Sequence, residues 1–402
     1  MRSKSDKKKP LVPSLRFPEF REAGAWEVKR LGELSEIVRG GSPRPITDYI
    51  TTDSEGLNWL KIGDVHQNEK YVTSTEEKVK KSAISKTREV YPGDLIMSNS
   101  MSFGRPYILK IKTCIHDGWI AVTDINNEVE RDYLYYFILS SSSQFYFRNA
   151  AAGGGVKNLN ADIVKLLSVS LPHYLEQQKI AHCLSSLDEV IGLQAKKVQA
   201  LKQHKKGLMQ QLFPAEGETT PHLRFPEFRE AGAWDKQRIG DLLSLEYGAP
   251  LPEGSRLEGD IPVIGSNGVV GYHSEPLIKG PAIVIGRKGS AGQVSWIDSP
   301  CYPIDTTFFV DLSRKDCQLR FIYLLLEHHR LQELVREGGV PGLNRDDVYA
   351  VKATISKHTE QQKIAHCLSS LDEVIGLESH KLDALKNLKK GLMQQLFPQD
   401  VA

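Results

Sequence analysis

The sequence predicts an α+β protein in which two pseudo-repeated domains are joined by two long helices. The string LRFPEFREAGAW occurs at residues 15–26 and again at 223–234, and EQQKIAHCLSSLDEVIGL occurs at 176–193 and again at 360–377. Self-similarity with a period of roughly 200 residues indicates a chain built of like units. The residues between the copies differ. The repeated segments therefore form a frame around two different segments, the fillings, at roughly 35–175 and 243–359. This arrangement suggests one scaffold with two different binding surfaces.

The repeat also predicts the domain boundaries. A chain of 402 residues is long enough for two or three domains, and the repeat favours two. The offset between aligned motifs falls from 208 residues (Leu15 to Leu223) to 184 residues (Glu176 to Glu360), so we expect extra loop residues in the first domain, mostly between Ile62 and Gly93. The expected segments are a basic flexible tail at 1–14, a first domain at 15–175, a first helix at 176–214, a linker at 215–222, a second domain at 223–359 and a second helix at 360–398.

Each copy of the longer repeat predicts a coiled-coil helix. Its apolar residues recur at the 3.5-residue spacing of an a/d seam. The seam residues of the two copies share one register: Ile180, Leu184, Leu187, Ile191, Val198, Leu201, Leu208 and Leu212 align with Ile364, Leu368, Leu371, Ile375, Leu382, Leu385, Leu392 and Leu396.

Polar residues interrupt this seam at matching places, Gln194 with Glu378 and Lys205 with Lys389. Thr359 and Gln362 predict a capping box at the start of the second helix, and each helix is expected to end before Phe-Pro because proline cannot continue it. Roughly 36 residues at 1.5 Å each give a rod of about 55 Å. We interpret the helices as a ruler, a pair of rods that holds the two domains apart at a set distance. The alternative is a core helix pair with no further role.

The fillings have the sequence pattern of compact domains that contain both strands and helices. Short strand-like runs are broken by clusters of Gly, Ser, Asn and Pro, and each filling holds one helix-like apolar run. The expected strands are Asn58–Ile62, Asp94–Met97, Ile120–Thr123, Ala282–Ile285 and Thr307–Asp311, and the expected helices are Asp132–Leu139 and Leu319–His328.

Two loops in each filling are candidate DNA-reading loops: Met97–Arg105 and Gly153–Asn160 in the first, and Ile285–Gln293 and Gly338–Arg345 in the second. They combine small residues, which allow close approach, with Asn, Ser, Arg or Lys side chains that hydrogen-bond base edges and phosphates. The other reading is that they are ordinary surface turns. The candidate DNA-binding residues are Lys61, Ser98, Asn99, Ser102, Arg105, Lys157 and Asn158 in the first filling, and Ser266, Asn267, Arg287, Lys288, Ser290, Asn344 and Arg345 in the second.

Composition excludes several classes of protein. The net charge is only +2, so the chain is not a polycation that binds nucleic acid through charge alone. The five cysteines form no CxxC pair, which fits a reducing compartment and predicts neither a zinc site nor a disulfide framework. No apolar run approaches the ~18 residues of a membrane span, and the segment MRSKSDKKKP lacks the apolar core expected of a signal peptide. We therefore expect a cytoplasmic protein.

Catalytic motifs are missing from the sequence. There is no GxxxxGK[ST] phosphate loop, no G-x-G-x-x-G and no Asp/Asn-Pro-Pro-aromatic quartet of the kind that amino-methyltransferases acting on DNA carry. His182 and His366 have no partnering ligands, and Asp117 and Asp305 lack the Glu-x-Lys of a nuclease. We predict no catalytic and no metal-binding residues.

Two motifs together carry a family resemblance. Residues Trp26–Leu34 and Trp234–Leu242 share W-x-x-x-R-[LI]-G-[DE]-L, and Glu176–Phe213 and Glu360–Phe397 share the E-Q-x-K-I-A to L-F helix pattern. With this doubled arrangement nearly the whole chain resembles the specificity subunits of type I restriction–modification systems. The resemblance implies an inverted pair of DNA-recognition domains on two antiparallel coiled-coil spacer helices, each domain reading one half of a bipartite asymmetric site in double-stranded DNA.

The resemblance also implies partners. Two methylation subunits would dock on the repeated surfaces, KKGLMQQLF among them, and restriction subunits would complete the complex. This chain would hold no cofactor, because S-adenosylmethionine, ATP and Mg would belong to the partner subunits. The identical segments have a simpler explanation in recent duplication, which the sequence leaves open.

Two alternative functions remain at this point. One is a coiled-coil adaptor that never touches DNA. Gel shifts with and without partner subunits would distinguish this adaptor from a DNA-recognition subunit. The other is a free-standing DNA-modifying enzyme, which labelled S-adenosylmethionine added to the purified chain would detect.

Overall fold

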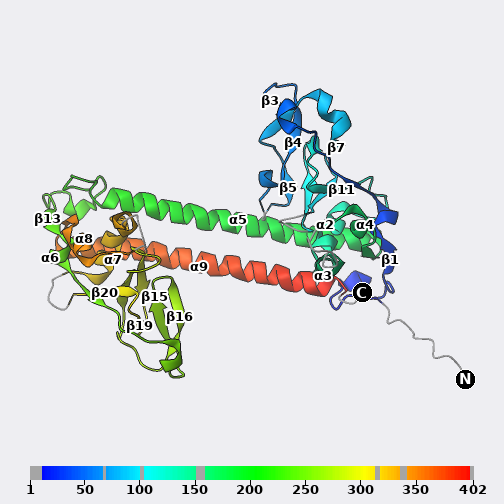
Figure 1. The fold of residues 1–402 in the computed structure, drawn as a ribbon. Coiled ribbons are helices and arrows are strands. Elements are labelled where there is room, and N and C mark those ends of the chain that lie inside the picture. The colour runs from blue at the N-terminus through cyan, green and yellow to red at the C-terminus, as the bar shows by residue number, and fades with distance from the viewer. Residues whose placement is uncertain are drawn as a thin grey trace, which may run out of the picture. The chain divides into compact units, whose positions relative to one another are not determined.

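The protein divides into two compact units that do not follow the sequence repeat. The computed structural model describes residues 11–66, 69–99, 104–150, 159–312, 317–335 and 342–398. Unit 1 takes the chain up to Gln194 together with the part from Lys381 onward, and unit 2 is Ala195–His380. Each unit therefore contains the beginning of one long helix and the end of the other (Figure 1).

The two predicted long helices are confirmed. Helix α5 is Tyr174–Leu212 and α9 is His358–Leu396, each of 39 residues, and both end before Phe-Pro as expected. Within each unit the two helices run antiparallel, as Figure 1 shows. The predicted capping box is wrong: α9 already begins at His358, so Thr359 lies inside the first turn instead of capping it.

Ion pairs explain two of the polar interruptions in the seam. In unit 1 Lys389 of α9 lies 2.5 Å from Asp188 of α5, and in unit 2 Lys205 of α5 lies 2.7 Å from Asp372 of α9. These four side chains are only partly exposed. A lysine in the seam thus links the paired helices in each unit, at matching positions of the repeat.

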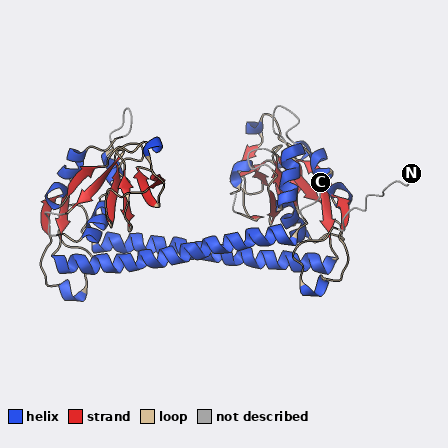
Figure 2. Ribbon diagram, turned by 90° about the horizontal axis from the view of Figure 1, so that it is seen from below, coloured by secondary structure: helices blue, strands red, loops and turns tan. Residues whose placement is uncertain are grey.

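The filling of unit 1 is built on two five-stranded sheets. Their strand orders are β2-β11-β8-β9-β5 and β3-β6-β4-β10-β7, and a separate pair joins β1 to β12. Figure 2 shows these strands grouped with short helices beside the long helices of the unit. The bounds are β1 Glu27–Arg30, α1 Leu31–Leu34, β2 Glu36–Arg39, β3 Ile50–Thr51, β4 Leu57–Leu60, β5 Tyr71–Val72, β6 Glu77–Val79, β7 Arg88–Val90, β8 Leu95–Ser98, β9 Pro106–Leu109, β10 Thr113–Ile115, β11 Trp119–Thr123, α2 Arg131–Leu139, α3 Ser141–Ala150, α4 Ala161–Lys165 and β12 Ser168–Leu171.

The filling of unit 2 repeats this plan with fewer strands. A four-stranded sheet has the order β14-β20-β17-β18, a three-stranded sheet has the order β16-β15-β19, and β13 pairs with β21. The bounds are β13 Asp235–Arg238, α6 Ile239–Leu242, β14 Ser244–Tyr247, β15 Ile261–Gly265, β16 Gly268–His273, β17 Ala282–Gly286, β18 Val294–Ile297, β19 Tyr302–Pro303, β20 Thr307–Asp311, α7 Leu319–His328, α8 Arg345–Ala350 and β21 Lys352–Ile355.

The two fillings are the same fold with different additions. Both contain a parallel strand pair at the same place, β4 with β10 in unit 1 and β15 with β19 in unit 2, and unit 1 has a second parallel pair, β5 with β9. The extra residues between Ile62 and Gly93, expected as loop, also form structure: they supply β5, β6 and β7. Of these, β5 and β7 are edge strands, one in each sheet of unit 1, so the falling sequence offset reflects added sheet edges as well as loops.

Buried ion pairs join the two repeated sequence motifs. The Arg16 guanidinium of the LRFPEF leader contacts both carboxylate oxygens of Glu176 in α5, at 2.8 and 2.7 Å, and Arg224 contacts Glu360 of α9 in the same way at 2.8 Å. Each arginine also donates to a backbone carbonyl of its own leader. The leader and the start of the helix thus contact each other through the same ion pair in both units. This shared contact accounts for the presence of both sequence motifs in each repeat.

The end of each long helix lies in a hydrophobic core. In unit 2 Phe213 stacks on Phe321 with ring centroids 5.3 Å apart, and in unit 1 Phe397 lies 5.6 Å from Tyr133. The helix of each sequence repeat therefore ends in the core that contains the other repeat's leader tryptophan. The last residues of KKGLMQQLF, expected as part of a docking surface, are buried anchors in both copies.

Candidate nucleic-acid interface

The two candidate loops of unit 2 lie against each other. One loop follows β17 and the other precedes α8, and the Leu343 amide donates to the Arg287 carbonyl at 2.9 Å. An isolated bridge also pairs Lys288 with Gly342. Glycine makes the first loop tight, because a Cβ on Gly292, whose φ is +79°, would lie 2.5 Å from a backbone nitrogen. Residues about 55 positions apart in the chain thus form one surface.

Two arginines from these loops converge on one exposed tyrosine. The Arg287 and Arg345 guanidinium carbons lie 5.1 and 5.3 Å from the centroid of the Tyr247 ring, at the end of β14. Phe308 and Tyr349 flank the two arginines at 5.9 Å. Guanidinium groups at these distances are attracted by the electrons of the ring. Tyr247 itself is 50% exposed.

This arginine–tyrosine cluster is suited to an anionic or hydrogen-bond-accepting ligand. The Nε atoms of Arg287 and Arg345 are buried and find no acceptor among the described residues. Arg345 donates only a long hydrogen bond, 3.5 Å, to the Leu245 carbonyl. Two guanidiniums at one ring repel each other unless an acceptor lies between them. Guanine O6 and N7 or a phosphate would supply that acceptor.

The remaining candidates of unit 2 surround the cluster or support it. Lys288 is exposed on the loop. Ser290 donates to the Asn267 side chain at 2.6 Å, and Ser266 packs under Gly289, so these residues join the neighbouring turn to the loop. Asn344 caps α8 by accepting from the Asp346 amide at 3.0 Å, so its oxygen is already used within the protein.

Unit 1 makes the same loop junction with different side chains. The Leu159 amide donates to the Asn99 carbonyl at 3.0 Å, which repeats the Leu343–Arg287 bond. Asn99 is 8% exposed, and its amide donates to the Asp117 carbonyl at 3.0 Å, while Ser98 is fully buried. Two residues that the sequence offered as DNA contacts are therefore buried, and the Asn99 amide is turned toward the Asp117 backbone.

The position of Tyr247 is taken in unit 1 by Arg39, the last residue of β2 as Tyr247 is the last of β14. Arg39 donates to the Asp117 carbonyl at 3.1 Å, and Ser42 donates to the Asp117 carboxylate at 2.9 Å. Arg44, 84% exposed, and His116 approach the same carboxylate at 3.5 and 3.1 Å. Burial alone would raise the pKa of Asp117, but the Ser42 hydrogen bond and the charges of His116 and the arginines lower it.

Sequence reasoning missed Tyr247 and this Asp117 cluster. A signal was present: the offset of 208 that aligns the leaders also aligns Arg39-Gly40 with Tyr247-Gly248. Both glycines are required, because a Cβ at either would lie 2.1 Å from a carbonyl oxygen. Two aligned glycines that follow unlike side chains, Arg39 and Tyr247, would have marked the site.

The other unit 1 candidates have mixed surroundings. Lys61 pairs with Glu77 at 2.8 Å, a hydrogen bond that raises the pKa of the lysine. Arg105 is half-buried 5.8 Å from the Tyr107 ring, with its Nε lacking an acceptor in the described part of the chain. Ser102, Lys157 and Asn158 lie outside the described residues.

The described residues show neither a metal site nor a membrane span. Across the ranges that the structure describes, no three His, Cys, Asp or Glu side chains are grouped as metal ligands. No helix in those ranges is both long and apolar enough to cross a membrane.

Comparison with known proteins identifies relatives over both repeats. A sequence profile described as type I restriction modification DNA specificity domain matches residues 24–203 and 232–387. The chain is 22% identical over 420 residues to the type I restriction enzyme MjaVIII specificity subunit of Methanocaldococcus jannaschii, covering 95% of this chain and 93% of that one. It is 23% identical over 405 residues to the putative type I restriction enzyme MjaX specificity subunit of the same organism, covering 92% of each.

Solved structures share the fold. The S subunit of a type I restriction–modification system from M. genitalium aligns with a TM-score of 0.64 at 16% identity, over 96% of this chain and 99% of that one. A chain from a study of complex assembly and conformational transition of the type I R-M system aligns with a TM-score of 0.56 at 16% identity, over 98% of this chain and all of that one.

Proposed function

Because this chain belongs to the family of type I restriction modification DNA specificity domains, we propose that it is the subunit that gives a type I restriction–modification complex its DNA sequence specificity. Its role is recognition without catalysis. Each unit reads one half of a bipartite, asymmetric site in double-stranded DNA, and the long helices set the gap between the halves.

One observation carries this proposal. The two units join their loops by the same backbone hydrogen bond, Leu159 to Asn99 and Leu343 to Arg287, but surround that bond with different side chains. Unit 2 offers arginines on a tyrosine, and unit 1 offers a carboxylate among basic residues. One frame with two different polar surfaces is what the reading of two different base sequences requires.

The proposed DNA-reading surface differs in composition between the units. In unit 2 Arg287 and Arg345 are proposed to contact bases, with Tyr247 positioning both, and Lys288, Ser266, Asn267 and Ser290 at the margin. In unit 1 the exposed Arg39 and Arg44 beside Asp117 are proposed as donors in place of the buried Ser98 and Asn99, with Lys61 and Arg105 as further candidates. Arginine and aspartate have complementary preferences, guanine and cytosine respectively.

The partners follow from the family. We propose that two methylation subunits dock on the repeated parts of the frame, and that restriction subunits join the full complex. S-adenosylmethionine, ATP and Mg belong to those partners. The repeated Arg–Glu contacts support this reading, because they build the same leader-to-helix surface in both units.

Exchange of one filling tests the proposed function. Replacing residues 35–175 by the corresponding segment of another family member is expected to change one half of the modified site and to leave the other half as it was, because each unit has its own loop junction. The measurement is a map of modified adenines in the DNA of a host that carries the hybrid chain and the partner subunits. A change in both halves, or in neither, would contradict the assignment of one half-site to each unit.

Lengthening the helices tests the ruler. Helix α5 is continuous from Tyr174 to Leu212, so seven residues inserted after Gln194, with seven more after Glu378, keep the heptad register of both helices. Each arm grows by about 10 Å, or about three base pairs at ~3.4 Å each. We expect modified sites whose halves are unchanged and whose gap is about three base pairs longer. A folded, assembled variant that still modifies sites of the original spacing would show that another element sets the gap.

A further inference from the structure

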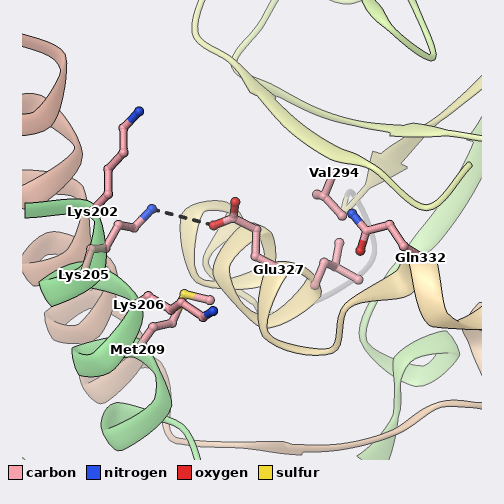
Figure 3. A pocket seen from close by; sticks show the side chains of 8 residues that line it. Lys202, Lys205, Lys206, Met209, Val294, Glu327 and Gln332 are labelled. Atoms are coloured by element: carbon pink, nitrogen blue, oxygen red, sulfur yellow. Dashed lines mark ion pairs between the residues drawn. The ribbon is translucent and has the colours of Figure 1, made fainter. Parts of the chain in front are cut away.

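A second basic surface lies on a long helix beside the reading loop of unit 2. Lys202, Lys205 and Lys206 of α5 line a cavity of about 260 Å³ together with Glu327 of α7 and Gln332. Figure 3 shows the lysines on one side of this cavity, with the glutamate and the glutamine facing them. Residues four apart share one face of a helix, so Lys202 and Lys206 present their ammonium groups on the same side.

The cavity has an excess of positive charge. Lys205 lies 2.7 Å from Asp372 and 3.7 Å from Glu327, and Arg320 lies 2.8 Å from the same aspartate. These two carboxylates balance Lys205 and Arg320. Lys202 and Lys206 are exposed, and the structure pairs neither with a carboxylate of the described residues. Two ammonium groups are therefore left for a ligand.

The cavity lies at the end of the loop that carries Arg287, a proposed base contact. Val294, which lines it, begins β18 directly after the loop that starts with Arg287. The same end of that loop lies against the backbone of Gln332, whose nitrogen would lie 2.5 Å from a Cβ on Gly292. The arginine–tyrosine cluster and the lysines thus lie at opposite ends of one short loop.

The same residues recur in unit 1. The repeat places Lys386, Lys389 and Lys390 on α9 where α5 has Lys202, Lys205 and Lys206. There Gln144, the counterpart of Gln332, donates to the Gly104 carbonyl at 3.0 Å. The lysine triplet and the glutamine thus occur in both units, although in unit 1 Lys386 lies 3.8 Å from Asp383.

We propose that Lys202 and Lys206 bind backbone phosphates of the duplex next to the bases that unit 2 reads. The inference rests on the proposed function and adds a sequence-independent contact made by the spacer helix itself. Phosphate contacts position a protein on the duplex, whereas base contacts specify the sequence. A lysine is a point charge suited to phosphate and does not impose base geometry.

The salt dependence of DNA binding tests this contact. The full chain, together with the subunits that co-purify with it, is titrated onto a random-sequence duplex by fluorescence anisotropy between 50 and 200 mM KCl, as wild type and as the double variant Lys202→Gln, Lys206→Gln. Loss of two phosphate contacts should lower the slope of log K against log salt by about 1.8 and weaken binding at 0.1 M salt roughly ten- to hundredfold. The variant Lys202→Arg, Lys206→Arg keeps both charges and should keep the wild-type slope.

A matched control separates a local contact from the loss of charge alone. Lys196→Gln removes one exposed lysine from another face of the same helix, and its slope should stay at the wild-type value. An unchanged slope in the double variant overturns the phosphate contact. An unchanged slope with loss of a co-purified protein identifies the lysines as a protein-docking surface and also overturns it. A wild-type complex that binds no duplex would instead refute the proposed function.

Discussion

Replacing Glu176 by alanine is expected to destabilise unit 1 by about 3–5 kcal/mol. The carboxylate makes two hydrogen bonds with Arg16, at 2.8 and 2.7 Å, and the two side chains are only 1% and 6% exposed. Removal of the glutamate leaves a buried guanidinium without its counter-charge, and the cost of that unpaired charge exceeds the loss of the hydrogen bonds. Hydrogen exchange of the full chain, measured peptide by peptide, would locate the loss in unit 1.

Two controls give this prediction its specificity. Glu19→Ala removes an exposed carboxylate of the same leader, which lies 3.1 Å from Lys179, and should have a much smaller effect because solvent already screens that pair. The double variant Arg16→Met, Glu176→Leu removes both charges and should recover most of the lost stability. A single variant as stable as the wild type would show that the pair does not hold the leader on the helix.

The second large effect is expected on DNA recognition. Arg287→Ala and Arg345→Ala should each weaken the complex with the specific site by about 1–3 kcal/mol, roughly 5- to 150-fold, if each guanidinium makes a bidentate guanine contact. Binding to random duplex should change little. The measurement is anisotropy or gel shift with specific and random duplexes, using the chain assembled with its partner subunits.

Further variants distinguish the ways in which the cluster can act. If an arginine touches phosphate only, affinity should fall equally on all sequences and the salt slope should change by about one. Tyr247→Phe keeps the ring that both guanidiniums approach, whereas Tyr247→Ala removes it, so only the alanine variant should lose discrimination. Arg229→Ala removes an exposed arginine of the same unit and should change neither quantity. Unchanged binding by both arginine variants would exclude the cluster from the site.

The frame was readable from the sequence because its signals are local or repeated. The heptad spacing predicted both long helices to within two residues at their starts and ends. The strand-like runs at Asp94–Met97 and Ile120–Thr123 became β8 and β11, and the apolar run at Leu319–His328 became α7 with the same bounds. Each of these patterns is decided by neighbours along the chain.

The loops were only partly readable. The repeat paired the two candidate loops of each filling, and the structure joins both pairs by matching hydrogen bonds. Composition could not distinguish Asn99, whose amide is turned inward to the Asp117 carbonyl, from an asparagine at the surface. It also could not indicate that Tyr247, 40 residues before Arg287, stands beside it.

By itself the sequence determined the duplicated frame, the two long helices, the α+β character of the fillings and the family. Helix and strand periodicity and verbatim repetition are written along the chain, so no packing is needed to recognise them. Only the tertiary structure decided that each helix ends in the core holding the other repeat's leader, that Lys205 and Lys389 are paired with aspartates, and which polar side chains of the loops face outward. These features depend on contacts between residues tens to hundreds of positions apart, and burial, which selects among such contacts, is a property of the packed molecule.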